Sequence, residues 1–353
     1  MINFCTLFDS NYLTRGIALY ESLKATCSEF HLYVVAFNDS CYQYLHKAPL
    51  EGLTPIMLKE FEDAELLRIK PTRSSAEYCW TCTPSIILYC LKNFDLPSCT
   101  YIDADMIFYH DPHLLFDEMG EKSIFITEHN YTREYDQSEQ SGKYCVQFMI
   151  FKNNQDGLAA LTWWRDRCIE WCYARVEDGK FGDQKYLDEW HTRFAGVQVS
   201  ENPGAGVAPW NVQHFRVSEM GGKKMITHHS EQKSHPLIFY HFHGVKFYTD
   251  DKVSCCGPIY EIRQQVKEQL YFPYFKKLLS IEKQLVGNVE FNVNGAKVPA
   301  PGKTRILLDF FKDRLLLLKS GNISIQGLKF KNFKKNHFHF YKLNRKDGTI
   351  DRS

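Results

Sequence analysis

Two aspartates stand two positions apart within an otherwise apolar stretch, residues 100–108, which is rich in Tyr, Ile and Phe and predicts a buried β-strand. Because residues i and i+2 of a strand point the same way, Asp103 and Asp105 are expected to share one face. Two like charges on a core strand are costly unless a cation neutralises them. Hard oxygen ligands suit Mg²⁺ or Mn²⁺, which keep positions open for substrate phosphates. The alternative is a pair of solvated aspartates at an exposed strand end.

Polar residues also close two further predicted strands. Asp9-Ser10-Asn11 follows the first strand, and His241 lies at the end of a later one. Imidazole is an acceptable Mn²⁺ ligand, so His241 is a candidate third ligand beside Asp103 and Asp105. His243 is the competing candidate, because it would face the opposite side of an extended strand. Taken alone, His241 is better interpreted as a structural histidine and Asp9 as a turn residue, and only the combination of motifs favours a site.

The elements that must position these residues alternate between strand and helix. The predicted strands span residues 2–8, 31–37, 54–58, 100–108, 123–127, 145–151 and 237–242. Helices are predicted between them, one of which would begin at Thr83-Pro84 with Pro in its first turn. Residues 130–143 are polar without a period and predict a mobile loop. This alternation predicts an α/β fold with a mostly parallel sheet, whose ligands bind outside the carboxyl ends of the strands.

Composition narrows the function class. The 353 residues carry a formal net charge of +1, which argues against a general nucleic-acid binder. No basic segment followed by an apolar core opens the chain, and no apolar run approaches the ~20 residues of a membrane span. We therefore expect a cytoplasmic protein whose 12 cysteines are mostly buried, reduced thiols. The lone Cys79-x-x-Cys82 pair is weak evidence for zinc.

The C-terminal part differs from the rest. Residues 301–353 contain 13 Lys and Arg but four Asp and Glu, whereas the preceding residues are acidic overall. We predict a first domain over residues 1–253 and a helical, basic extension over residues 254–353. The segment 304–318 is amphipathic and the segment 329–346 is very basic, a pattern typical of a helix lying on an anionic membrane. The alternative is a helix packed on the domain, followed by a solvated charge run.

With these motifs in view, the chain resembles the family 8 glycosyltransferases over residues 2–247. Phe8-Asp9-Ser10-Asn11-Tyr12 is similar to the family's N-terminal nucleotide-binding segment, and Asp103-Ala104-Asp105 to its metal-binding Asp-x-Asp. Asp183-Gln184 matches its Asp-Gln near the donor sugar. His241, with Gly244 and Lys246 after it, matches its closing motif, in which the His ligates metal and the Lys contacts phosphate. The resemblance implies a GT-A fold, a UDP-sugar donor, Mn²⁺ or Mg²⁺, and retention of configuration.

The sequence also departs from this family. The segment 78–83 lacks the Arg that usually lies near the phosphates, and Gln147 stands where the family carries an Asn. Gly244 and Lys246 are one residue closer together than usual. Because the sugar-reading positions are those that differ, the resemblance does not transfer the identity of the donor sugar.

The expected function is transfer of a hexose from a UDP-sugar to a glycan or glycolipid, in the synthesis of a cell-surface polysaccharide or lipopolysaccharide. In that reaction Gln184 would orient or stabilise the sugar and Asp183 would bind one of its hydroxyls, although Asp183 is also a common choice for a helix cap. A sugar-nucleotide nucleotidyltransferase is the competing enzyme class, but it needs a basic, Gly-rich loop after the first strand, which this sequence lacks. A non-catalytic sugar-binding protein of the same fold is the other alternative.

Overall fold

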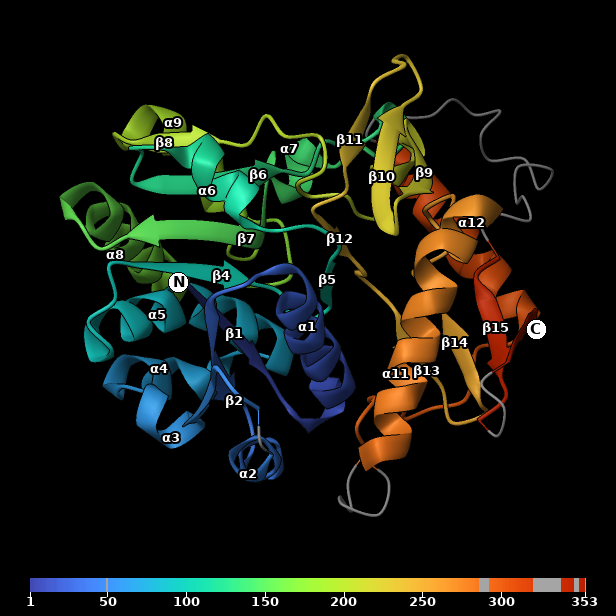
Figure 1. Cartoon of the computed structure of the whole chain (residues 1–353), viewed down its shortest axis with the longest axis horizontal. Helices are drawn as coiled ribbons and strands as arrows, with labels where there is room; N and C mark the ends of the chain where they lie inside the picture. Colours follow the sequence, from blue (N-terminus) through green and yellow to red (C-terminus); the bar gives the residue numbers. More distant parts are fainter. Residues whose placement is uncertain (49, 286–291, 320–337, 346–348, 353) are drawn as a thin grey trace.

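The computed structural model describes residues 1–48, 50–285, 292–319, 338–345 and 349–352. Its centre is a seven-stranded sheet in the order β3-β2-β1-β4-β7-β6-β8 (Figure 1). The strands are β1 (Ile2–Phe8), β2 (Phe30–Ala36), β3 (Leu53–Met57), β4 (Ser98–Ile102), β6 (Ile124–Glu128), β7 (Tyr144–Lys152) and β8 (Val197–Val199). Neighbouring strands are parallel except at β7, which runs antiparallel to β4 and β6.

Helices cover both faces of this sheet. The longer helices of the described chain are α1 (Leu13–Thr26), α5 (Ser75–Asn93), α8 (Gln155–Glu170), α11 (Phe272–Leu285) and α12 (Lys303–Lys319), the last of which packs against Tyr248 and Phe340. The shorter ones are α2 (Asp39–Lys47), α3 (Leu58–Phe61), α4 (Ala64–Ile69), α6 (His113–Met119), α7 (Ser138–Ser141), α9 (Trp190–Arg193) and α10 (Gln264–Val266). The predicted fold class, α/β with a mostly parallel sheet and helices on both faces, is confirmed.

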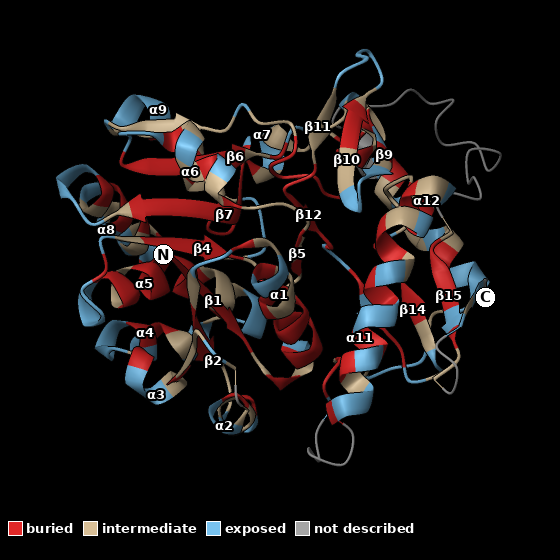
Figure 2. Ribbon diagram, in the orientation of Figure 1, coloured by how far each residue is buried: buried red, intermediate tan, exposed pale blue. Residues whose placement is uncertain are grey.

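Residues of β1 alternate between two hydrophobic cores, one on each face of the sheet. Phe4 and Phe8 belong to the core that contains α1, whereas Cys5 and Leu7 belong to the core that contains α5 and α8. Figure 2 shows the central strands as a buried layer between helices whose outer faces are exposed. A strand buried on both faces is mostly apolar, as β1 is apart from Asn3 and Thr6, and this composition makes the strand easy to recognise in the sequence.

The helix predicted to begin at Thr83-Pro84 begins eight residues earlier. Ser74 accepts a hydrogen bond from the backbone N–H of Glu77, and the Glu77 carboxylate accepts one from the N–H of Ser74. This reciprocal capping box fixes the first turn of α5 and satisfies two amides that would otherwise lack partners. Pro84 therefore lies inside the helix, where it forgoes one backbone hydrogen bond. The loop predicted over residues 130–143 likewise contains α7 and a short 3₁₀ helix, Arg133–Tyr135.

Three small sheets flank the central one. β5 (Met106–Phe108) pairs antiparallel with β12 (Phe239–His241). β9 (Phe215–Met220), β10 (Lys223–His228) and β11 (Ser234–Pro236) form an antiparallel sheet. β13 (Lys246–Phe247), β14 (Lys252–Ser254), β15 (Phe340–Leu343) and β16 (Ile350–Arg352) form the last one.

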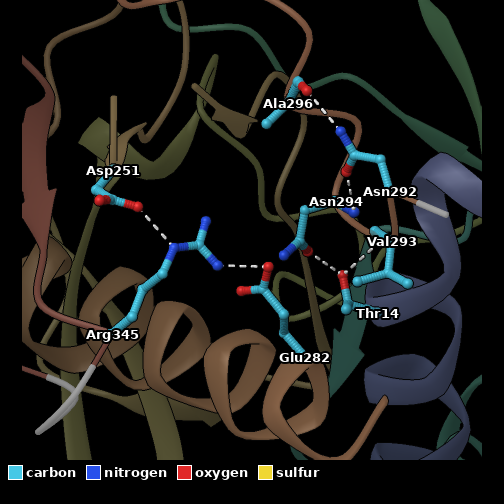
Figure 3. Close-up of polar contacts among 8 residues, drawn as sticks. All are labelled: Thr14, Asp251, Glu282, Asn292, Val293, Asn294, Ala296 and Arg345. Atoms are coloured by element: carbon cyan, nitrogen blue, oxygen red, sulfur yellow. Dashed lines mark hydrogen bonds and ion pairs between the residues drawn. The ribbon is translucent and has the colours of Figure 1, made fainter. Parts of the chain in front are cut away.

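The C-terminal segments pack onto the N-terminal ones. Residues of α11, together with Tyr341 and Leu343, belong to the same hydrophobic core as Phe4 and α1. Arg345 joins two parts of this region, because its guanidinium is 2.7 Å from Asp251 and 2.5 Å from Glu282 (Figure 3). The boundary predicted after residue 253 falls inside β14, which pairs with β15 from the far end of the chain.

The amphipathic helix predicted for a membrane surface is α12, and the protein itself covers part of its apolar face. Ile306 packs with Tyr248 and Phe340, Phe310 is fully buried, and Arg314 lies 2.5 Å from Glu134. Leu307, Phe311 and Leu318 are half-buried, whereas Leu315 is 48% exposed. Ile306 and Phe310 are therefore unavailable to a lipid surface, as the alternative interpretation expects.

Much of the predicted basic run lies outside the described residues. These are Lys329, Lys331, Lys334, Lys335 and Lys346. Lys342, in contrast, is exposed on β15. No helix in the described part of the chain combines the length and apolarity needed to cross a membrane.

Candidate functional site

Asp103 and Asp105 lie in a turn rather than within one strand. β4 ends at Ile102 and β5 begins at Met106, whose N–H donates to the Asp103 carbonyl over 3.3 Å. The Asp103 N–H donates to the Gln147 carbonyl of β7 over 3.1 Å, which anchors the turn to the central sheet. The prediction that the two carboxylates share a strand face is therefore wrong. They lie together because the turn projects both toward the same neighbour.

That neighbour is His241, at the end of β12. The antiparallel pairing of β12 with β5 places His241 opposite Met106, directly after the turn. Its Nε2 lies 3.0 Å from Asp105 Oδ1 and 3.6 Å from Asp103 Oδ2. One ligand atom from each of the three residues falls within 4.8 Å of the others. Two carboxylates and an imidazole are a donor set suited to a divalent cation, so these residues fit the predicted Mn²⁺ or Mg²⁺.

Gln147 holds the other side of the His241 ring. Its Oε1 lies 3.0 Å from His241 Nδ1, and its Nε2 donates to Thr127 Oγ1 over 3.3 Å. Since Oε1 can only accept, Nδ1 carries a proton, and Nε2 faces the carboxylates, where it can ligate a cation once it has lost its own proton. Gly206 leaves room for this amide: a Cβ there would lie 2.8 Å from Gln147 Nε2. Gln147, predicted to contact the nucleotide sugar, is fully buried behind the histidine.

The three candidate ligands titrate as one group. Burial raises the pKa of Asp103 to about 6, against the attraction of His241. Burial also acts to raise the pKa of Asp105, but His241 outweighs it and lowers this pKa to about 2. Burial would lower the pKa of His241, whereas Asp105 and Asp103 raise it. Without a metal, the cluster therefore retains a proton, which a divalent cation would displace.

Asp183 and Gln184 begin the turn before the 3₁₀ helix Lys185–Glu189. Asp183 is 6% exposed, and its carbonyl accepts a 2.8 Å hydrogen bond from the indole of Trp164. Burial raises the pKa of Asp183 to about 8, and the charge of Asp103 adds to the rise. Gln184 Nε2 donates to the Ser141 carbonyl over 2.8 Å, which fixes its amide.

Two residues near this pair were not predicted. The Thr83 hydroxyl, which donates to the Cys79 carbonyl over 3.4 Å, lies close enough to the Asp183 carboxyl to oppose the rise in its pKa, and the Trp80 ring lies against Gly182, where a Cβ would be 3.6 Å from the indole. Both lie on α5, within the segment in which the sequence lacks the expected Arg. The absence of the expected Arg from residues 78–83 was the signal that could have identified them. This segment borders the site even without the Arg, so its other side chains are candidates for site residues.

The predicted nucleotide-binding segment forms a 3₁₀ turn, Ser10–Tyr12. Asp9 caps it: its Oδ1 accepts from the Asn11 N–H over 2.9 Å and its Oδ2 from the Asn11 side chain over 2.6 Å. Tyr12 is 40% exposed, and the guanidinium carbon of Arg15 lies 4.3 Å from the centre of its ring. Phe8 is buried in the core at 4% exposure, as is Ala104 at 8%. Gly244 and Lys246 are exposed, beside the end of β12.

The structure thus brings together some predicted residues and separates others. Asp103, Asp105 and His241 form one cluster, and the charge of Asp103 helps to raise the pKa of the nearby Asp183. His243 lies outside the ligand group, with its ring centre 5.5 Å from that of His241 and 5.5 Å from that of Trp210. Cys79 and Cys82 do not belong to any group of three or more potential metal ligands among the described residues.

Comparison with known proteins identifies relatives. No family model matches the chain. The uncharacterized protein YfnD of Bacillus subtilis (strain 168) is 31% identical over 281 residues, which cover 78% of this chain and 88% of YfnD. This chain belongs to the YfnD family. YfnF from the same organism, also uncharacterized, is 30% identical over 259 residues, or 71% of this chain and 84% of YfnF.

Solved structures similar to this YfnD-family chain include two glycosyltransferases. The galactosyltransferase LgtC, in complex with donor and acceptor sugar analogs, is 12% identical, with a TM-score of 0.47 over 82% of this chain and 100% of its own. Mouse xyloside xylosyltransferase 1, in its apo form, is 12% identical, with a TM-score of 0.42 over 69% of this chain and 97% of its own.

Proposed function

We propose that this protein is a metal-dependent glycosyltransferase that transfers a hexose from a UDP-sugar to a glycan or glycolipid acceptor of the cell surface, with retention of configuration. The observation that carries this proposal is the convergence of Asp103, Asp105 and His241, with the buried Asp183 close enough to sense the charge of Asp103. One part of the site is thus arranged to hold a cation, and an adjacent part presents a carboxyl and an amide, which suit sugar hydroxyls.

In this reaction the bond between the anomeric carbon and the diphosphate breaks, and negative charge gathers on the leaving group. Asp103, Asp105 and His241 would hold Mn²⁺ or Mg²⁺, which supplies electrostatic stabilisation to that charge when bound. Lys246 is exposed beside the end of β12, so its ammonium group can approach the same phosphate oxygens. The Tyr12 ring would contact the nucleotide base, with Asp9 holding the turn that presents it.

Asp183 and Gln184 serve the sugar end. With its pKa raised to about 8 by burial, Asp183 is largely protonated at neutral pH and can donate a hydrogen bond to a sugar hydroxyl. A protonated carboxyl cannot act as the base for the acceptor. The acceptor hydroxyl therefore attacks the anomeric carbon from the side the diphosphate leaves, and its proton passes to a leaving phosphate oxygen. Gln184 Oε1 supplies a carbonyl dipole for the positive charge that develops on the sugar.

A panel of nucleotide sugars incubated with the purified protein tests this function. We expect slow hydrolysis of one or a few UDP-sugars that requires Mn²⁺ or Mg²⁺ and stops with chelator. Proton NMR of the first-formed sugar should show the α-anomer from an α-linked donor. A β-anomeric signal would disprove retention. Release of diphosphate from a nucleoside triphosphate and a sugar phosphate would instead identify a nucleotidyltransferase.

A further inference from the structure

Arg15 is a buried cation in the first turn of α1, three residues after Tyr12. Arg15 is 3% exposed, and in the described part of the chain it forms no ion pair with a carboxylate. Its guanidinium donates instead to three carbonyl oxygens: Asn11 over 3.3 Å, Val245 over 3.0 Å and Asn294 over 3.4 Å. A buried charge is costly unless it is well hydrogen-bonded. A buried arginine at such a position therefore indicates a role other than packing.

The partners of Arg15 come from three segments far apart in the sequence. Asn11 belongs to the nucleotide-binding turn, and Val245 lies between Gly244 and Lys246. The same guanidinium lies 4.3 Å from the Tyr12 ring centre and 5.6 Å from that of Phe247. Cation–π contacts of this kind hold an aromatic ring in place. Arg15 thus contacts both ends of the surface where a nucleoside diphosphate would lie.

The third segment is Asn292–Ala296, here termed the strap. The Val293 carbonyl accepts from the N–H and the hydroxyl of Thr14, each over 3.3 Å, and the Thr14 hydroxyl also contacts Asn294 (Figure 3). Val293 and Asn294 are 5% and 2% exposed. A Cβ at Gly295, where φ is +69°, would lie 3.3 Å from Asn11 Cβ. The strap is thus fitted closely against the nucleotide-binding turn.

We propose that Arg15 is a positioning residue of the donor site, which, together with the strap, fixes Tyr12 relative to the Val245–Lys246 backbone. This inference rests on the proposed function. Tyr12 is 40% exposed and would contact the base, and Lys246 is exposed and would contact the diphosphate. With their separation already fixed, a ligand that contacts both does not have to order them, and the free energy cost of binding falls.

This role predicts a specific pattern of ligand affinities. In Arg15→Met, uridine can use the Tyr12 side alone and inorganic diphosphate the Lys246 side alone, whereas UDP needs both in register. We expect UDP affinity to fall about tenfold, in line with the loss of charged hydrogen bonds and a cation–π contact, and the two fragments to lose much less. Mn²⁺ affinity without nucleotide should not fall, because its candidate ligands lie on other elements and loss of the Arg15 charge, which acts on Asp105, removes a repulsion from the cation. General destabilisation would not separate UDP from its fragments.

Calorimetric titration of full-length protein with UDP, uridine, diphosphate and Mn²⁺ provides the test. Arg193→Met is the matched control, because Arg193 also stacks on a ring, 4.7 Å above Trp163, but on the surface, and UDP affinity should not change. Arg15→Lys, which keeps the charge but cannot reach three carbonyls, should give an intermediate affinity. If Arg15→Met does not fold, Gly295→Val, which forces a side chain against Asn11, should weaken UDP binding severalfold with the same fragment pattern.

The outcomes separate this inference from the proposed function. Wild-type protein that binds no UDP would overturn the proposed function, and the role of Arg15 with it. Wild-type protein that binds UDP, with a folded Arg15→Met or Gly295→Val variant that binds it equally well, would overturn the positioning role alone. Equal losses for UDP, uridine and diphosphate would also overturn it, because such losses show damage to separate contacts.

Discussion

Asp105 and Asp183 belong to one site, yet their surroundings shift their pKa values in opposite directions. Asp105 lies 3.0 Å from the His241 ring, which outweighs burial and holds its pKa at about 2. In the described part of the chain no cation pairs with Asp183, so burial raises its pKa to about 8. The difference teaches that a neighbouring cation, rather than depth alone, decides whether a buried carboxylate stays charged. One aspartate is prepared for a metal and the other for a neutral hydrogen bond.

The largest change in Mn²⁺ affinity should come from removing the charge of Asp105. Asp105→Asn keeps the size of the side chain but removes the carboxylate nearest to His241. We expect Mn²⁺ affinity to fall about 100-fold or more, because loss of a residue that only supports a ligand already costs up to about 100-fold and Asp105 is a candidate ligand itself. Donor hydrolysis should fall with it. Calorimetry with Mn²⁺ alone measures the Mn²⁺ affinity, and an assay coupled to UDP release measures donor hydrolysis. Near-normal hydrolysis in the presence of chelator would show that the metal site is misassigned.

A smaller effect is expected behind the histidine. Gln147→Leu removes the acceptor for His241 Nδ1, so the ring is free to change tautomer and rotate. Mn²⁺ affinity should fall about tenfold, as is common for loss of such a partner. Imidazole ¹⁵N NMR of His241 should show Nδ1 protonated in wild type and a mixture of tautomers in the variant.

The control for this variant is Gln198→Leu, which removes a part-buried amide that donates to a β8 carbonyl. It should leave Mn²⁺ affinity and the His241 spectrum unchanged. Wild-type protein with Nδ1 unprotonated would contradict the orientation inferred from the Gln147 contact.

The sequence predicted which residues belong to the candidate site better than it predicted the backbone geometry that holds them. The type and spacing of Asp103 and Asp105 were sufficient to predict a cation site, because two carboxylates in an apolar run need one. The turn between them was missed because Ile102, Ala104, Met106 and Phe108 are all buried, so the alternation of a strand continues across the break. The start of α5 at Ser75 was missed although the capping pair, Ser74 and Glu77, was present in the sequence.

Other features depend on partners distant in the chain. Gln147 contacts His241 and Arg15 contacts Asn294, and neither pair has a local signal. The amphipathic pattern of α12 was correct, but a pattern cannot show what covers an apolar face, and here the protein itself buries Ile306 and Phe310. Local patterns thus predicted elements and two residues of the candidate cation site, whereas the contacts between distant segments became visible only in the fold.

The last expected effect concerns the pH dependence of stability at the neutral member of the pair. An Asp in an unfolded chain has a pKa of about 3.9, and folding raises that of Asp183 to about 8. Between these values the folded state binds more protons than the unfolded state, so this group lowers stability as pH rises from ~4 to ~8. At about 1.4 kcal/mol per pKa unit, the loss has a ceiling of roughly 6 kcal/mol. Asp183→Asn cannot ionise and should escape it.

We therefore expect Asp183→Asn to unfold in urea at the same midpoint as wild type near pH 4, and at a clearly higher midpoint near pH 9, both with chelator present. Asp166→Asn, at an exposed position on α8, is the control and should follow wild type at both values. A variant no more stable than wild type at pH 9 would mean that Asp183 is charged in the folded protein at neutral pH. The contrast with Asp105 would then disappear, and Asp183 would be available as a base or a second anionic group beside the metal cluster.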